Sequence, residues 1–234
     1  MRIYPSVDIY NGKCVKGVHN SASFEDYGDP IEWALKWQSM GAECLHLVDV
    51  NAAMGETPNY QLVEQIVRNL KIPVQFGGGI ASWDGVKRCL EEIGISRIVT
   101  GTLAYKEMDK LSWARGRFGD RLIVSIDAID GKVATHGRED LSDMDAIEFA
   151  LRVKEAGIDT ILYTDVTRDG TFKGPNLMRT EAMIKKTWMN IMVSGGIRSI
   201  EDIHAIRGTG ACGAVIGRAL YEGNIDFKQA LELK

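Results

Sequence analysis

The sequence predicts one α/β domain over residues 1–234, folded as a (β/α)8 (TIM) barrel built from two duplicated half-barrels. Three observations support this prediction. Short segments rich in Val and Ile alternate with segments whose apolar residues recur every three or four positions, as in amphipathic helices. The alternation continues along the chain without a linker. Motifs of the first half also return in the second half at a nearly constant offset.

Eight apolar segments are expected to form the parallel strands. Each is a continuous apolar run, which is typical of strands covered on both faces. In chain order they read RIYPSVDI, CLHLVDV, IPVQFGG, RIVTG, LIVSID, TILYTDV, NIMVSGG and GAVIG. A doubly wound open sheet is the main alternative, and it would leave the internal repeat unexplained.

Helical patterns follow most of these strands. Several end at glycine, as helices commonly do, and the 45% hydrophobic content is enough for a sizeable core. The clearest patterns read DPIEWALKWQSMGA, YQLVEQIVRNL, WDGVKRCLEEIG, MDAIEFALRVKEAG, RTEAMIKKTW and IEDIHAIRGTG.

Four pairs of matched motifs define the repeat, with halves of about residues 1–117 and 118–234. The pairs are VDIYNGKCV with IDAIDGKVA, LVDVNAAMGETPN with YTDVTRDGTFKGPN, FGGGI with SGGI, and VTGTLAY with VIGRALY. Two copies of four βα units would close the barrel with two-fold pseudo-symmetry.

The composition argues against several classes of function. A net charge of −4 without a basic cluster disfavours nucleic-acid binding and a polybasic membrane surface. The N-terminus MRIYPSVDIY lacks the pattern of a signal peptide, and no apolar run is long enough to span a bilayer. The four cysteines are scattered without a CxxC pair. We therefore expect a cytoplasmic, soluble monomer with no nucleic-acid partner and no membrane association.

Glycine-rich strand ends predict two phosphate-binding sites. In a (β/α)8 barrel the loops after the strands build the active face, and glycines there let backbone N–H groups approach an anion. A single glycine pair is better explained as a tight turn, but two at equivalent places indicate a ligand with a phosphate at each end. The residues of the two predicted sites are Gly78, Gly79, Gly101 and Thr102 in the first, and Ser194, Gly195, Gly196, Gly217 and Arg218 in the second.

Aspartates follow the same symmetry. Asp8 ends the first predicted strand and Asp127 the fifth, so the two should face each other across the barrel mouth. One ionised and one protonated carboxyl group could act as base and acid on opposite sides of a ligand. A lone aspartate at a strand end is more often a turn former or a cap, which is how we interpret Asp49 and Asp165.

The remaining polar candidates are weaker. Asp169, in the segment RDGT, either contacts the ligand or shapes a turn with Gly170. The histidines show no HExxH pairing, so no metal site is expected. Of the four, we expect His46 in the core, His204 on a helix surface, and His19 and His136 on loops of the active face.

Taken together, these segments resemble the ProFAR isomerases of histidine biosynthesis, which act on phosphoribosylformimino-aminoimidazole carboxamide ribotide. The resemblance runs from the first strand to the last helix. It is carried by VDIYNGK, HLVDV, VQFGGGI, VTGT, SIDAIDGKVATHG, TDVTRDGTFKGPN, VSGGIRSIEDI and VIGRALYEG. It implies an Amadori rearrangement of an aminoaldose to an aminoketose, on a small bisphosphorylated substrate and without a cofactor.

The resemblance also implies a role for four residues. Asp8 would be the general base that takes the proton from the sugar carbon beside the reacting centre. Asp127 would be the general acid that opens the ribose ring, with the Thr164 hydroxyl beside it and Asp169 near the reacting ribose. The residues themselves agree with this, because an aldose–ketose isomerisation needs one acid and one base and no metal.

Two positions depart from the family pattern. Where the family usually has Gly-Trp after the fifth strand, this chain has Gly137-Arg138, and a guanidinium can stack on an aromatic ring or pair with phosphate but is not an indole. Lys16 stands where the family usually has Arg. Lys16 and the segment THGR instead resemble the cyclase subunit of imidazole-glycerol-phosphate synthase. We expect Lys16 and Arg138 to contact the substrate.

These departures leave two other activities open. The first is an isomerase broadened or shifted toward phosphoribosylanthranilate, the equivalent step of tryptophan synthesis, because Arg138 stands where the two substrates would be distinguished. The second is the cyclase, a lyase that needs a glutaminase partner to deliver ammonia, although its later motifs are absent. A non-catalytic phosphosugar-binding barrel is disfavoured by the presence of both Asp8 and Asp127.

Overall fold

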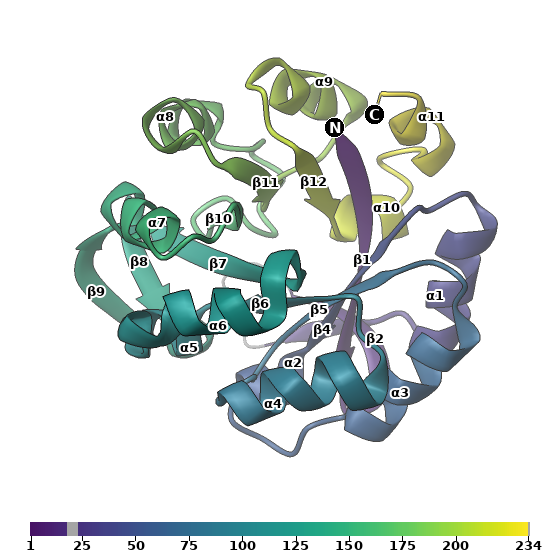
Figure 1. Cartoon of the computed structure of the whole chain (residues 1–234). Coiled ribbons are helices and arrows are strands. Elements are labelled where there is room, and N and C mark those ends of the chain that lie inside the picture. The colour runs from purple at the N-terminus through teal and green to yellow at the C-terminus, as the bar shows by residue number, and fades with distance from the viewer. Residues whose placement is uncertain (18–22, 234) are drawn as a thin grey trace.

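A closed ring of eight parallel strands forms the centre of the computed structural model, which describes residues 1–17 and 23–233 (Figure 1). Each strand pairs with the next, and the last returns to pair with the first through Arg2 and Gly213. The predicted (β/α)8 barrel is confirmed. The ring consists of β1 (Arg2–Tyr10), β4 (Leu45–Asp49), β5 (Val74–Gly77), β6 (Arg97–Thr100), β7 (Leu122–Ile129), β10 (Thr160–Asp165), β11 (Asn190–Ser194) and β12 (Gly213–Ile216).

Helices surround the ring. The six predicted helices correspond to α1 (Pro30–Ser39), α3 (Tyr60–Asn69), α4 (Trp83–Arg88), α7 (Ala146–Glu155), α8 (Leu177–Thr187) and α9 (Ile200–Gly208). A π-helical segment, Cys89–Ile93, continues α4. Five helices were not predicted, most of them because they are too short to show a helical period. They are α2 (Val50–Ala53), α5 (Thr102–Lys106), α6 (Leu111–Phe118), α10 (Arg218–Tyr221) and α11 (Phe227–Glu232).

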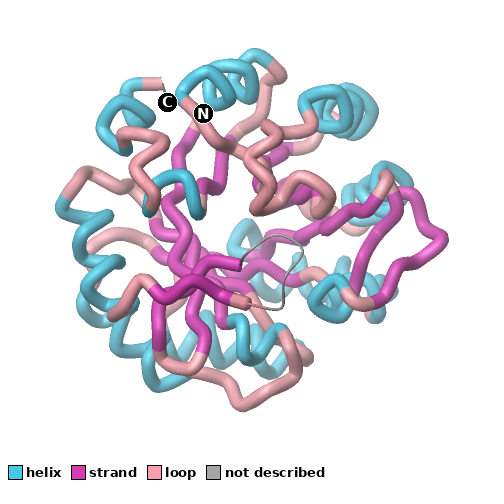
Figure 2. The backbone as a smooth tube through the Cα atoms, turned by 180° about the vertical axis from the view of Figure 1, so that it is seen from behind, coloured by secondary structure: helices cyan, strands magenta, loops and turns pink. Residues whose placement is uncertain are grey.

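Four further strands correct the expectation that strands and helices simply alternate. They are β2 (Lys13–Gly17) and β3 (Phe24–Asp26), which follow β1, and β8 (Lys132–Thr135) and β9 (Asp140–Asp145), which follow β7. Each set is antiparallel, and Figure 2 shows β8 and β9 extending away from the ring at the right. Asn11-Gly12 and Asp130-Gly131 form the two hairpin turns, with φ of 48° and 74° and of 50° and 84°. Positive φ at both central residues is what a type I′ turn requires.

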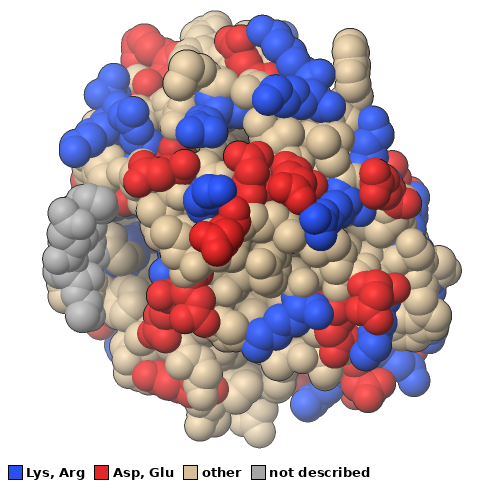
Figure 3. Space-filling view, turned by 90° about the vertical axis from the view of Figure 1, so that its left-hand side faces the viewer, with Lys and Arg blue, Asp and Glu red and all other residues tan. Residues whose placement is uncertain are grey.

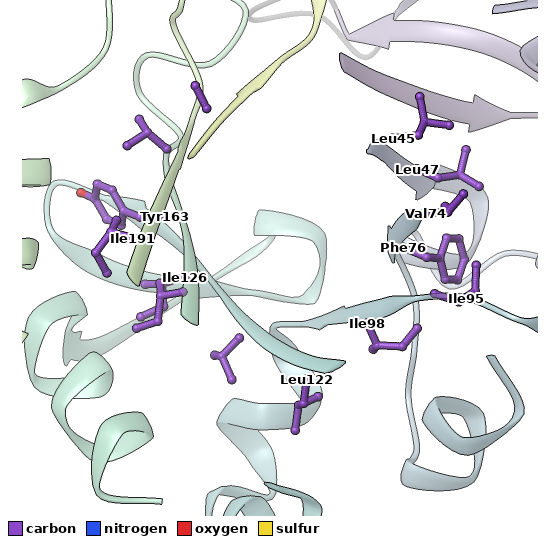
Figure 4. Packing of buried hydrophobic residues seen from close by; sticks show 14 of the residues in the cluster. Leu45, Leu47, Val74, Phe76, Ile95, Ile98, Leu122, Ile126, Tyr163 and Ile191 are labelled. Carbon is purple, nitrogen blue, oxygen red and sulfur yellow. The ribbon is translucent and has the colours of Figure 1, made fainter. Parts of the chain in front are cut away.

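The barrel has two apolar cores, because side chains alternate between the two faces of each strand. The outer core lies between the strands and the helices; in Figure 4, Leu45 and Leu47 on β4 lie beside Val74 and Phe76 on β5. The inner core fills the ring itself and contains Tyr4, Cys44, Val99, Ile123, Leu162, Met192 and Val215.

One face of the molecule is mixed in charge. Figure 3 shows acidic and basic side chains interspersed over one face. Within the described residues, no helix combines the length and the apolar character needed to cross a membrane.

Candidate active site

Asp8 and Asp127 lie at the same end of the barrel, on its inner face. In β1, Tyr4 belongs to the inner core, so Asp8, four residues later, faces the same interior. Ile123 and Asp127 stand in the same relation in β7. Because β1 and β7 are the first and fifth strands of the ring, the two carboxylates come from opposite walls. Thr164 lies in register with Asp127 on the neighbouring strand β10 and is buried.

A buried lysine pairs with Asp8. Lys16 Nζ lies 2.9 Å from Asp8 Oδ2, and the residue is 3% exposed. The same ammonium donates to the carbonyl oxygen of Ser6 at 3.0 Å and to its Oγ at 2.6 Å. Tyr221 contacts both partners of this arrangement. Its hydroxyl donates to the Ser6 carbonyl at 2.7 Å, and its ring centroid lies 4.8 Å from the Lys16 ammonium. Burial raises the pKa of Tyr221 well above its ordinary value, so the hydroxyl stays a donor.

An arginine connects the carboxylates on the opposite wall. Arg138 Nε donates to Asp127 Oδ2 at 3.2 Å, and its NH1 donates to Asp169 Oδ2 at 2.7 Å. Partial loss of water around the guanidinium opposes the charge of Arg138, whose side chain is 37% exposed, but the two carboxylates outweigh this effect and raise its pKa. The structure thus brings together Asp127, Asp169 and Arg138, three residues that the sequence predicted for the site.

The loop that carries Arg138 has an uncommon backbone. His136, Gly137 and Arg138 all have positive φ, of 50°, 65° and 80°. Non-glycine residues adopt this conformation at a cost, and such residues cluster at functional sites. The loop is tied to the start of α5, which follows β6, because the backbone N–H of His136 donates to Thr102 Oγ1 at 2.9 Å.

Asp49 and Asp165 are structural caps, as predicted. The buried Asp49 carboxylate accepts from the backbone N–H of Ala52 at 3.1 Å and from the backbone and side-chain nitrogens of Asn59 at 2.6 and 2.8 Å. Asp165 is equivalent in the second half. It accepts from the backbone and hydroxyl of Thr167 at 3.0 and 2.6 Å and from Asn176 Nδ2 at 2.6 Å. The repeat therefore extends to these loop clamps.

The predicted glycine turns are also matched in the two halves. Gly78 and Gly79 have φ of 103° and 62°, and Gly195 and Gly196 have φ of 88° and 78°. A Cβ on Gly79 would lie 2.2 Å from the backbone of Ala52. Backbone packing therefore already requires glycine in the first turn. Phosphate binding by these turns, with Ser194 at the end of β11, stays a prediction.

The second pair of predicted phosphate-binding segments opens two short helices. Gly101 and Thr102 lie where α5 begins, and Gly217 and Arg218 lie where α10 begins. A Cβ on Gly217 would lie 3.6 Å from Lys16 Nζ, so Lys16 stands beside this segment. Arg218 pairs with Glu25 at 3.3 Å and with Glu222. Gly170, with φ of 67°, follows Asp169 in the loop after β10.

The histidines lie mostly where we expected them. His46 is buried inside the barrel, its Nδ1 lies 2.9 Å from Gln75 Nε2, and burial lowers its pKa to about 4. His204 is exposed on α9, and His136 lies in the active-face loop, 2.6 Å from Asp140 Oδ2. His19 lies outside the described residues. Among the described residues, no group of three or more His, Cys, Asp or Glu side chains could hold a metal ion.

Sequence reasoning missed Ser6 and Tyr221. Ser6 had a usable signal, because it precedes Asp8 by two residues and therefore shares its face of the strand. Tyr221 had none, because its contact with Ser6 joins residues 215 positions apart in the sequence.

Comparison with known proteins identifies the family. A family described as histidine biosynthesis protein matches residues 2–226. Three bacterial relatives are each named 1-(5-phosphoribosyl)-5-((5-phosphoribosylamino)methylideneamino) imidazole-4-carboxamide isomerase. The chain is 43% identical to that of Ruminiclostridium cellulolyticum, covering 99% of each chain. It is 41% identical to those of Thermoanaerobacter pseudethanolicus and Acetivibrio thermocellus, covering 100% of this chain and 99% of each relative. The chain therefore belongs to the histidine biosynthesis protein family, together with these isomerases.

Proposed function

We propose that the chain is the aldose–ketose isomerase of histidine biosynthesis that converts ProFAR, the aminoaldose, to PRFAR, the aminoketose. Relatives that match nearly the whole chain carry this activity in their names. The observation that carries the proposal is the placement of Asp8 and Asp127 on opposite strands at one end of the barrel. Matched glycine turns at that end fit a substrate with a phosphate at each end.

The chemistry follows from these positions. Asp127 donates a proton to the ring oxygen of the ribose, so the ring opens as the carbon–oxygen bond breaks and a carbon–nitrogen double bond forms. Asp8 then removes the proton from the neighbouring carbon, C2. The electrons of that C–H bond form a double bond between C1 and C2, and those of the carbon–nitrogen double bond return to nitrogen. The resulting enolamine becomes the ketone when C1 gains a proton and the hydroxyl group on C2 loses one. Thr164 and Asp169 lie beside the acid, and they would orient the ribose hydroxyl groups. One acid and one base suffice for this sequence of steps.

Turnover of ProFAR by the purified protein tests the proposal. The Asp8→Asn and Asp127→Asn variants should each lower kcat by at least ~100-fold, the scale of a lost acid or base. Asp109→Asn, which changes an exposed carboxylate in the turn before α6, is the matched control and should leave kcat unchanged. Near-normal turnover in either active-site variant would remove that residue from its role. Turnover without ammonia or a partner protein would also exclude the cyclase.

Arg138 favours a second candidate substrate, phosphoribosylanthranilate. Its guanidinium lies against Asp127 at the active end, and a guanidinium pairs readily with an aromatic carboxylate such as that of anthranilate. Assays of both substrates with the native protein and Arg138→Met distinguish the cases. Use of phosphoribosylanthranilate that Arg138→Met selectively abolishes would support dual activity. Turnover of ProFAR alone would exclude it.

A further inference from the structure

The two half-barrels differ at one buried position beside their matched aspartates. In the first half Asp8 lies opposite Val15, so the next residue of that hairpin strand is Lys16. In the second half Asp127 lies opposite Ala134, and the next residue is Thr135. Lys16 and Thr135 are therefore equivalent, and they are 3% and 8% exposed. The same buried position holds an ammonium in one half and a hydroxyl in the other.

The surroundings of Lys16 are built to hold this charge. Its ammonium lies between Asp8 Oδ2 and both oxygens of Ser6, at 2.6 to 3.0 Å, which satisfies three donors. Tyr221 contacts the ammonium with its ring and the Ser6 carbonyl with its hydroxyl. Tyr105 is the tyrosine equivalent to Tyr221 in the first half, and its ring packs at 5.4 Å against Phe149.

The cation on the Asp127 side differs in kind. Arg138 comes from a loop, its side chain is 37% exposed, and it is shared between Asp127 and Asp169. Exposed ion pairs bind weakly, whereas a buried charge that loses its partner is strongly disfavoured. The two aspartates are similarly exposed, at 25% and 29%, but Lys16 is buried and Arg138 is not, so separating Asp127 from Arg138 costs less than separating Asp8 from Lys16.

We propose that Lys16 is a positioning residue that holds Asp8 as an oriented carboxylate, and that Thr135 leaves Asp127 without such a buried cation and able to carry a proton. The single difference would divide a symmetric site into a base side and an acid side. This inference rests on the proposed function, because it explains how two aspartates at matched positions take opposite roles.

Three described titratable groups near Asp8, other than Lys16, carry no charge at neutral pH. Burial raises the pKa of Cys14 on β2 and that of Tyr221 on α10, and it lowers the pKa of His46 on β4 to about 4. Removing the ammonium of Lys16 therefore changes the charge next to Asp8 without a substitute from these neighbours. Asp8 would then lack the positive charge that lies 2.9 Å from its carboxylate.

The test is the pH profile of ProFAR turnover by Lys16→Met. We expect kcat at pH 7 to fall at least ~10-fold and the acidic limb of kcat/KM to move up by about one pH unit or more, with recovery at higher pH. The KM should change less than about threefold, because Asp8 and Ser6 already take up the Lys16 ammonium. Lys16→Arg, which keeps the charge, should restore most of the rate. Lys13→Met, an exposed lysine on the same strand, and Thr135→Val should leave the limb in place.

Two outcomes would overturn the proposal. A raised KM with an unmoved limb would make Lys16 a contact to a phosphate at Gly217, and an equal shift in Thr135→Val would remove the asymmetry. Circular dichroism checks folding, and Lys16→Gln, which keeps polar contacts, replaces Lys16→Met if the latter is unfolded. If the native protein does not turn over ProFAR, the proposed function is wrong, but the role of Lys16 can still be tested. A ¹³C NMR titration of the Asp8 carboxyl then decides the matter, because an unchanged midpoint in Lys16→Met refutes the positioning role.

Discussion

Removing the Asp49 carboxylate should cost far more stability than removing an ordinary helix cap. Asp49 is fully buried and accepts three hydrogen bonds, from Ala52 N and from both nitrogens of Asn59. In Asp49→Ala the backbone N–H of Ala52 stays buried, and that of Asn59 half-buried, without this acceptor. Each such donor costs about 1–3 kcal/mol, so the free energy of unfolding should fall by roughly 3 kcal/mol.

Thermal unfolding followed by circular dichroism measures this loss. In a chain of this size 1 kcal/mol corresponds to about 2–4 °C, so Tm should fall by roughly 6–12 °C. Asp226→Ala is the matched control. That residue caps α11 through one exposed bond to Gln229 N at 3.0 Å, and its loss should cost about 1 kcal/mol, or roughly 2–4 °C.

Equal decreases in the two variants would refute the reasoning, because burial and bond number would then not determine the cost. The effect bears on the site as well. A Cβ on Gly78 would lie 2.3 Å from the carbonyl oxygen of Asp49, so the Asp49 loop packs directly on the first predicted phosphate turn. We expect Asp49→Ala to loosen that turn.

Two further predictions concern the barrel interior and the glycine turns. Burial lowers the pKa of His46 from 6.5 to about 4, so the unfolded chain takes up a proton there before the folded chain does. The free energy of unfolding should therefore be constant above about pH 6.5, as far as His46 is concerned, and fall by on the order of 3 kcal/mol as the pH drops to about 4. Urea unfolding at several pH values should show a smaller decrease for His46→Leu than for the native protein. The same decrease in both proteins would contradict this. Gly79→Ala should lower stability by more than about 3 kcal/mol, because its Cβ would lie 2.2 Å from Ala52 at a φ of 62°. Gly116→Ala, inside α6 with open space around it, should raise stability by about 0.5–1 kcal/mol, and urea unfolding of both variants tests this contrast in sign.

The eight barrel strands could be predicted because strands covered on both faces are continuous apolar runs in the sequence. The hairpin strands lack that signal: β9 reads DLSDMD and is largely exposed. Their turns, Asn11-Gly12 and Asp130-Gly131, did carry a hairpin signal, and we interpreted these segments only as parts of the repeat. Local turn chemistry was thus visible, and its consequence for the fold was missed.

The candidate site also has a part that could be predicted from the sequence and a part that could not. The repeat was enough to place Asp8 and Asp127 at one end of the barrel, because their positions follow from strand order alone. The ion pairs of Lys16 and Arg138 with these carboxylates depend on side-chain directions and on loop backbone, neither of which has a local signature. Tyr221 meets Ser6 only because β12 and the helix after it return to β1.

The strands outside the ring are the places where the sheet could grow. Closure leaves the eight parallel strands without a free edge, and β3 and β9 terminate the branches of the described sheet. Both are acidic: β3 contains Glu25 and Asp26, and β9 contains Asp140, Asp143 and Asp145. Two copies that met edge to edge would bring like charges together, so concentrated protein should resist association through these edges into larger aggregates.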